Sequence, residues 1–249
     1  MPTLIFLNHD GIIVDKIIGF YNAEDYLQKI INIFNGIDTF LSLKNDYISG
    51  KNNMEVLSKL ANKCEYNFDL KLCTDIYSDI LLIDENLIDS KILFKSKLFF
   101  AKINLDNNNS SSILKLIKET NDLESLKVTY ETLIHYYQIN SQSDNEANAY
   151  KTFSDRISTD PDVLNGYAWR MSELRMNLND ALDKVTIAVD LTANEPLKQA
   201  NIIDTKAEIL WVMGRYVDAI ETINLAIDIN SESNYFRNQK IKFQNSLKE

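Results

Sequence analysis

The two cysteines have the greatest capacity for redox chemistry in this 249-residue sequence. Cys64 and Cys73 lie nine residues apart on two expected neighbouring helices, so a disulfide is possible if their Cα atoms come within about 7 Å. Both also fall on apolar helix faces, where cysteine serves as a small packing residue. Buried packing is the favoured interpretation, and a disulfide is the alternative. Because no C-x-x-C occurs in the chain, the sequence assigns no redox centre.

Histidine offers no metal site or catalytic base in a recognisable setting. His9 falls in an expected turn and His135 on an expected helix, far apart and with no cysteine cluster beside either. The sequence also lacks a nucleophile-elbow pattern and a glycine-rich phosphate loop. We therefore predict no catalytic residue, no metal and no cofactor.

The charge balance limits the kinds of partner. The net charge is -10 and the pI is near 4.8, with the acidic residues spread along the chain. Such a chain is unsuited to nucleic acid or an anionic membrane surface as its main partner. No apolar run approaches the roughly 20 residues of a membrane-spanning helix, and no signal peptide starts at Met1. We expect neither nucleic-acid binding nor membrane insertion.

The stretch from residue 162 to residue 230 contains two copies of one pattern. Ala181 and Ala219 are 38 residues apart, and so are Ala188 and Ala226. Each copy predicts a helical hairpin, and in the second copy Gly214 ends the first helix. One hairpin cannot bury its apolar face alone, so copies must stack. The pattern resembles the tetratricopeptide repeat, most clearly at residues 162–195 and 200–231.

That resemblance implies a binding groove lined by the first helix of each hairpin. The candidate residues lie on these helices but off the expected packing face: Asn165, Trp169, Glu173, Asp204, Glu208 and Trp211. Tryptophans beside carboxylates would suit a basic or amphipathic protein segment or peptide. The alternative is that both tryptophans pack between repeats while the carboxylates form a solvated face.

The first 36 residues predict a strand, a turn, a second strand and a helix, with the hairpin turn at Asp10-Gly11. With Pro2-Thr3 before the first strand and Gly19 after the second, this order resembles the C-terminal half of a thioredoxin fold. The resemblance implies that Pro2 is a cis-proline. The rival interpretation is a hairpin that caps the helical array.

This segment departs from the thioredoxin pattern because only Met1 precedes Pro2 and the family's C-x-x-C is missing. We therefore expect the chain to be the C-terminal part of a longer thioredoxin-like protein, similar to exported bacterial proteins that carry helical repeats. The apolar face of Leu4 to Phe6, Ile13 and Ile17 should then be incompletely covered. The compartment is unknown from the residues: a fragment implies a periplasmic or exported protein, and a complete chain implies a cytoplasmic one.

Helical patterns continue through the middle of the chain. Residues 53–86 predict a hairpin that carries both cysteines on its packing faces. Residues 90–105 predict an apolar helix with interspersed lysines, interpreted as a buried repeat helix rather than a membrane-surface helix. Residues 234–247 predict a polar final helix. The expected domains are a partial thioredoxin-like segment (1–36), a linker (37–52) and a repeat domain (53–249).

The predicted fold is mainly α: a superhelix of tetratricopeptide-like hairpins after a partial α/β segment made of a β-hairpin and one helix. The leading function is protein–protein interaction by the repeats of a thioredoxin-like protein, without catalysis in this chain. The first alternative is a thiol-disulfide oxidoreductase whose catalytic half lies upstream of Met1. The second is a structural repeat protein without a ligand.

Overall fold

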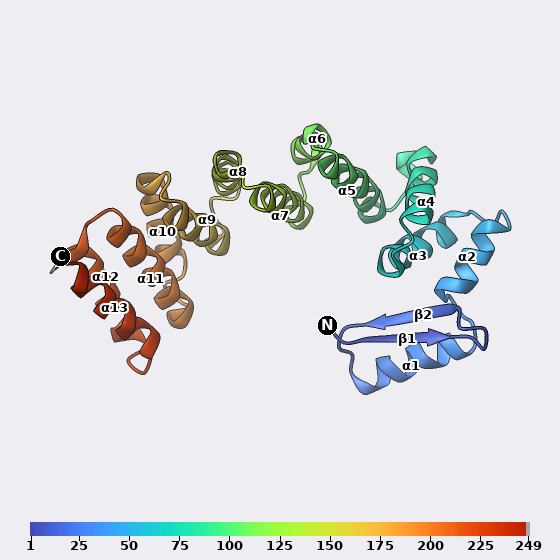
Figure 1. Cartoon of the computed structure of the whole chain (residues 1–249), viewed down its shortest axis with the longest axis horizontal. Helices are drawn as coiled ribbons and strands as arrows, with labels where there is room; N and C mark the ends of the chain where they lie inside the picture. Colours follow the sequence, from blue (N-terminus) through green and yellow to red (C-terminus); the bar gives the residue numbers. More distant parts are fainter. Residues whose placement is uncertain (248–249) are drawn as a thin grey trace. The chain divides into compact units, whose positions relative to one another are not determined.

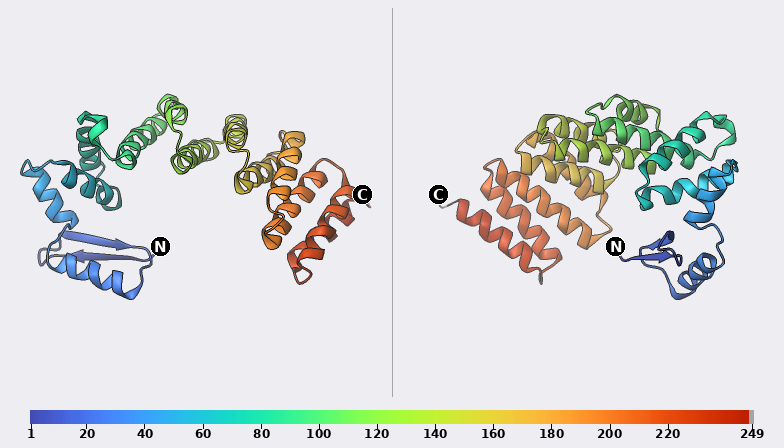
Figure 2. Two further views of the ribbon diagram at one scale, coloured as in Figure 1. Left: turned by 180° about the vertical axis from the view of Figure 1, so that it is seen from behind. Right: turned by 45° about the vertical axis from the view of Figure 1, so that its right-hand side comes forward.

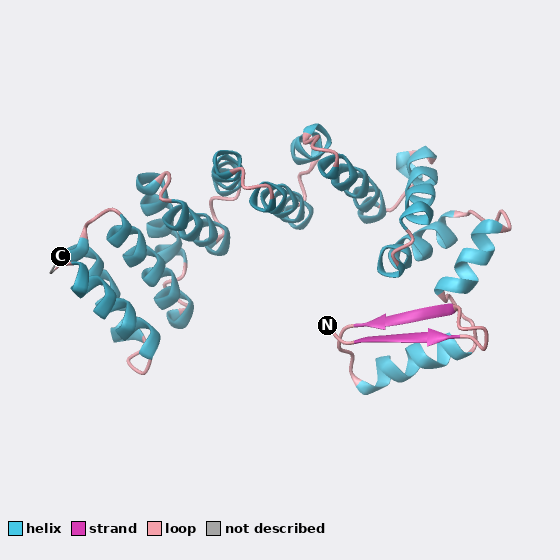
Figure 3. Cartoon of the chain, in the orientation of Figure 1, coloured by secondary structure: helices cyan, strands magenta, loops and turns pink. Residues whose placement is uncertain are grey.

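The computed structural model describes residues 1–247, which form a two-stranded sheet followed by thirteen α-helices (Figures 1 and 3). The predicted mainly α fold is confirmed. The chain divides into two compact units, unit 1 (Met1–Leu116) and unit 2 (Ile117–Glu249). This division falls within the helical region and not at the expected boundaries near residues 36 and 52.

Unit 1 begins with a β-hairpin, which is followed by one helix. Strands β1 (Thr3–Leu7) and β2 (Ile13–Ile18) pair antiparallel. In the turn, Asn8 Oδ1 accepts hydrogen bonds from the amides of Asp10 (3.0 Å) and Ile12 (2.8 Å), and Gly11 has a φ of +77°. Helix α1 (Ala23–Phe34) follows its N-cap, Asn22. This is the predicted order of elements.

The two strands differ in how far they are covered. Leu4 and Ile5 of β1 are 45% and 54% exposed, as expected for an incompletely covered face. Ile17 of β2 is buried instead, because helix α2 packs against β2. All peptide bonds of the described residues are trans, so Pro2 does not take the predicted cis form. Trans is the default for a proline bond that no surrounding structure constrains.

The expected linker at 37–52 is wrong, because these residues contain helix α2 (Phe40–Ile48). Thr39 caps the helix through its side chain, and Phe40 and Leu43 enter the core formed with the next two helices. The polar residues around this short helix obscured its apolar face. An ion pair also links β2 to the helix that follows α2, because the buried carboxylate of Asp15 lies 2.5 Å from the amine of Lys63.

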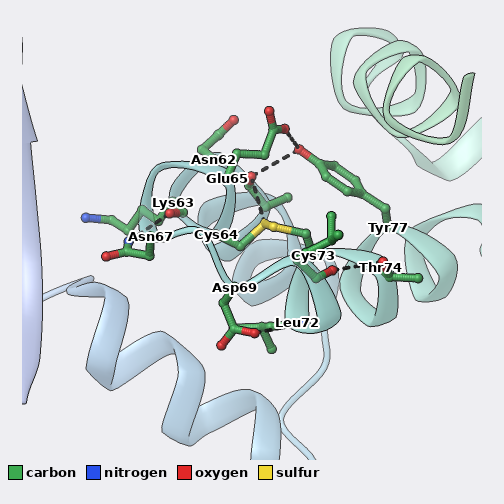
Figure 4. The surroundings of a disulfide bond; sticks show 12 residues. Asn62, Lys63, Cys64, Glu65, Asn67, Asp69, Leu72, Cys73, Thr74 and Tyr77 are labelled. Carbon is green, nitrogen blue, oxygen red and sulfur yellow. Dashed lines mark hydrogen bonds between the residues drawn. A yellow bond between two sulfur atoms is a disulfide. The ribbon is translucent and has the colours of Figure 1, made fainter. Parts of the chain in front are cut away.

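Helices α3 (Met54–Cys64) and α4 (Leu70–Leu82) form the predicted hairpin, with the 3-10 helix η1 (Glu65–Asn67) in its turn. Cys64 and Cys73 are joined by a disulfide, with their Cα atoms 5.5 Å apart (Figure 4). Both cysteines are buried, so they pack the core as favoured and also form the bond kept as the alternative. Beside them, the Tyr77 hydroxyl donates to Glu65 Oε1 at 2.5 Å.

After the 3-10 helix η2 (Glu85–Leu87), helix α5 (Ser90–Asp106) buries Leu98, Phe99 and Ala101. The prediction of a buried repeat helix is thereby confirmed. Across residues 1–247, none of the helices combines the length and the hydropathy needed to cross a lipid bilayer. Helix α6 (Ser111–Glu119) follows, and the division between the two units lies within it.

Unit 2 continues as three consecutive helical hairpins and a final helix (Figure 2). The hairpins are α7 (Leu123–Ile139) with α8 (Ser143–Arg156), α9 (Pro161–Leu174) with α10 (Leu178–Leu191), and α11 (Pro196–Val212) with α12 (Tyr216–Ile229). The final helix is α13 (Asn234–Ser246). Helices α9–α10 and α11–α12 match the two predicted repeats closely.

Small side chains allow these helices to approach one another. Ala181, Ala188, Ala219 and Ala226 are all fully buried, which explains their recurrence at a 38-residue interval. Gly214 ends the first helix of the last hairpin with a φ of +78°, a conformation that favours glycine. Stacking then joins the faces of successive hairpins into continuous apolar cores.

Candidate functional site

Unit 2 has a pocket between the first helices of two neighbouring hairpins. Helices α9 and α11 pack directly on one another, whereas α7 and α9 are separated by a pocket of about 390 Å³. Helices α7, α8 and α9 line it with these residues: Lys127, Glu131, Ile134, His135, Gln138, Tyr150, Phe153, Asp162, Val163 and Gly166. A pocket of this size with an apolar floor and a polar rim is suited to taking part of a ligand.

Helix geometry places these side chains together. On α7, which is capped by Asp122, residues 127, 131, 134, 135 and 138 recur at the spacing of one helix face. Tyr150 and Phe153 of α8 form the floor, and the Phe153 ring stacks on Tyr130 at 4.8 Å. On the far side, Asp160 caps α9 and presents the first turns of that helix to the pocket.

Gly166 widens the pocket on the α9 side. It lies inside a helix, where glycine is about 1 kcal/mol less favourable than alanine. A Cβ atom added at this position would meet no heavy atom within 4 Å. Core packing therefore does not require the glycine, and its absent side chain leaves open space at the wall of the pocket.

Two charged side chains of the pocket have a partner of opposite charge among the described residues, and a third does not. The Lys127 amine lies 2.7 Å from Asp160, and this hydrogen bond raises the pKa of Lys127. Asp162 pairs with Lys198 at 2.9 Å. Within residues 1–247, Glu131 makes no hydrogen bond or ion pair. Burial, with the nearby Glu146 carboxylate, raises the pKa of Tyr150, so its phenol stays neutral in the floor.

Three of the predicted groove residues lie on α9 near this pocket. Trp169 is 36% exposed, and its indole N–H donates to Glu173 at 3.2 Å. Between them, Arg170 bridges Glu173 and the buried Glu146 of α8 at 2.8 and 2.6 Å. Asn165 has a buried Oδ1 without a hydrogen-bond partner. The structure thus brings Trp169 and Glu173 together on an accessible face.

The other three predicted groove residues lie under the final helix. Asp204 and Glu208 are buried, and α13 contributes their partners: Tyr235 donates to Asp204 at 3.1 Å, and Lys242 pairs with Glu208 at 2.6 Å. Trp211 donates to Ser246 at 2.8 Å. The expectation of an open groove here is wrong, because α13 packs on α11 and α12 to bury Phe236 and Phe243.

Asp204 should make the stability of unit 2 depend on pH. Burial raises the pKa of its carboxyl to about 6, despite hydrogen bonds from Tyr235 and Gln239. Between pH 4 and 6 the folded chain then binds more protons than the unfolded chain, so the free energy of unfolding falls as pH rises. We therefore expect the free energy of unfolding of Asp204→Asn, measured relative to the parent, to rise by about 2–3 kcal/mol between pH 4 and pH 7. Urea denaturation of both proteins across this pH range tests this prediction. If the free energies of unfolding of parent and variant change in parallel with pH, the prediction is contradicted.

The described residues contain no group of three or more histidine, cysteine, aspartate or glutamate side chains arranged to hold a metal ion. The pocket itself was missed from the sequence. Its two signals were a glycine inside a helix and the run of polar residues on one face of α7. Both have common structural explanations, so neither singled out Gly166 or Glu131.

No protein-family model and no curated protein matches the sequence. Among solved structures, MamA of AMB-1 aligns with a TM-score of 0.46 and 12% identity over 73% of this chain and 94% of that chain. BtubC from P. vanneervenii gives 0.44 and 12% over 78% and 72%. The TPR2AB domain of yeast Sti1, in its HSP90 complex, gives 0.38 and 15% over 91% and 96%. The helical-hairpin fold of this chain follows from the packing of its own helices.

Proposed function

We propose that unit 2 is a protein-interaction module that binds a protein segment or peptide between α7 and α9. The observation that carries this proposal is the pocket at their junction. The neighbouring α9–α11 junction is closed by direct helix packing, and the α11 face is covered by α13. A binding segment therefore has an open seat at the α7–α9 junction.

The accessible part of α9 extends this seat. The line from Gly166 to Trp169 and Glu173 follows one side of the helix, so a segment that enters the pocket can continue over the indole ring. Aromatic side chains contribute a large share of the binding energy in many interfaces. We include Asn165, Trp169 and Glu173 in the proposed site, and we leave Asp204, Glu208 and Trp211 out.

Filling the pocket should abolish binding. We expect Gly166→Arg to weaken a bound peptide at least about 100-fold, because the new side chain occupies the seat. The helix should still form, since arginine is a better helix former than glycine. Dodecapeptides selected by display on the full chain are the probe, and fluorescence anisotropy measures their affinity.

Asn148→Arg is the matched control, because it adds the same charge at an exposed position of α8 that does not line the pocket. It should leave the affinity unchanged, and circular dichroism should show equal helicity for both variants. If the selection yields no peptide whose binding is lost in Gly166→Arg, the proposed function is contradicted.

We also propose that residues 1–36 belong to a thioredoxin-like fold, as the sequence resemblance implies. The β-hairpin with its Asp10-Gly11 turn, the left-handed φ of +102° at Gly19 and the exposed β1 side chains support this. An in-frame C-x-x-C upstream of the Met1 codon would establish the oxidoreductase alternative. A stop codon close upstream would remove it.

The Cys64–Cys73 bond supports a periplasmic or exported location, which is the compartment expected if the chain is part of a longer thioredoxin-like protein. Structural disulfides persist in oxidising compartments and are rare in the cytosol. Thiol labelling of the protein from its native cells, after denaturation without reductant, tests this. An unlabelled pair is expected, and two labelled thiols would argue for a reducing compartment.

A further inference from the structure

Unit 2 repeatedly places a cation between an acidic side chain and an aromatic ring where helices meet. Lys184 of α10, which is only 8% exposed, lies 2.5 Å from Asp155 of α8 and 4.4 Å from the centroid of the Tyr167 ring on α9. At the junction of α11 and α13, Lys242 lies 2.6 Å from Glu208 and 3.8 Å from the Trp211 ring centroid. Coulombic attraction and cation–π contact both favour this arrangement.

The α7–α9 junction has the same chemistry without the cation. Glu131 supplies a carboxylate on the rim, and Tyr150 and Phe153 supply aromatic surface in the floor. Lys127, the lysine of the pocket, is already held by Asp160 at 2.7 Å. The carboxylate of Glu131 therefore has no counter-ion within the described residues, and Gly166, which lines the same pocket, has open space around its Cα.

We propose that this pocket receives a lysine or arginine side chain of the partner, flanked by apolar residues that contact Ile134 and Val163. The inference rests on the proposed function and specifies the chemistry of the partner. Charge complementarity selects this occupant, since the chain carries a net charge of -10 and the free charge in the pocket is acidic.

A double-mutant cycle tests the pairing. The probe is a display-selected dodecapeptide, compared with a version in which its lysine is replaced by norleucine, and the protein variant is Glu131→Gln. We expect each change alone to weaken binding about tenfold, the usual scale for a charge-assisted hydrogen bond. The second change should then have little further effect, because both remove the same interaction. Glu221→Gln, at an exposed position of α12, is the matched control and should change nothing.

The outcomes separate the inference from the proposed function. Selected peptides that share a lysine or arginine and show coupling with Glu131 support the inference. Peptides that are lost in Gly166→Arg but show no basic residue in common and no effect of Glu131→Gln overturn the inference and leave the function standing. If no selected peptide responds to Gly166→Arg, the function fails and the inference fails with it.

Discussion

Replacing Arg170 with methionine is expected to destabilise unit 2 by about 3–5 kcal/mol, the usual cost of breaking a buried ion pair from one side. Glu146 is 2% exposed and receives hydrogen bonds from Arg170 Nε at 2.6 Å and Nη2 at 3.2 Å. Without the guanidinium, Gln138 would be the one side chain among residues 1–247 that still donates to this carboxylate, at 2.9 Å. The charge would then be buried with one neutral partner.

Urea denaturation followed by tryptophan fluorescence measures this loss, because Trp169 lies on the same helix as Arg170. Arg215→Met is the matched control: Arg215 pairs with Asp218 at 2.6 Å in an exposed position, and its loss should cost under about 1 kcal/mol. Adding Glu146→Gln to Arg170→Met should restore much of the stability, since the buried charge is then gone. Equal costs for Arg170→Met and Arg215→Met would contradict the account.

Removing the disulfide is expected to destabilise the α3–α4 hairpin by about 2–3 kcal/mol. Cross-linking residues nine apart restricts the unfolded chain, and the loop-closure model gives a stabilisation of this size for so short a loop. The variant Cys64→Ala/Cys73→Ala also leaves small voids, because both cysteines are buried. Its effect should therefore be at least as large as that of reducing the bond.

Hydrogen exchange locates the effect of removing the disulfide. Amides of α3 and α4 should exchange faster in the double alanine variant, while those of α9 to α12 in unit 2 serve as internal controls. The pair should also resist mild reductant in the folded state, because neither sulfur is accessible. Unchanged protection across α3 and α4 would show that packing alone holds the hairpin.

The repeats of unit 2 could be read from the sequence because their constraints are local. Close helix approach requires the small residues Ala181 and Ala219, which recur at a fixed interval. The left-handed turn residue favours glycine, which stands there as Gly214. The β-hairpin could likewise be predicted from its Asp10-Gly11 turn. Helix α2 was not, because its apolar face is completed by α3 and α4, which no local pattern encodes.

The candidate site was only half predictable. The position of Trp169 and Glu173 on the accessible side of α9 followed from helical periodicity. Periodicity could not tell that α13 would cover Asp204, Glu208 and Trp211, since those residues lie on the equivalent side of α11. The pocket depends on a gap between α7 and α9, and a gap between elements is a tertiary property that neither Gly166 nor the polar face of α7 specifies by itself.

The central claim is that partners bind between α7 and α9, and photo-crosslinking tests it most directly. A benzophenone amino acid replaces His135 at the pocket rim in one variant and Ile187, which is 45% exposed on α10, in another. We predict that a display-selected peptide crosslinks to the His135 position and not to the Ile187 position. Crosslinking at Ile187 without crosslinking at His135 would contradict the claim.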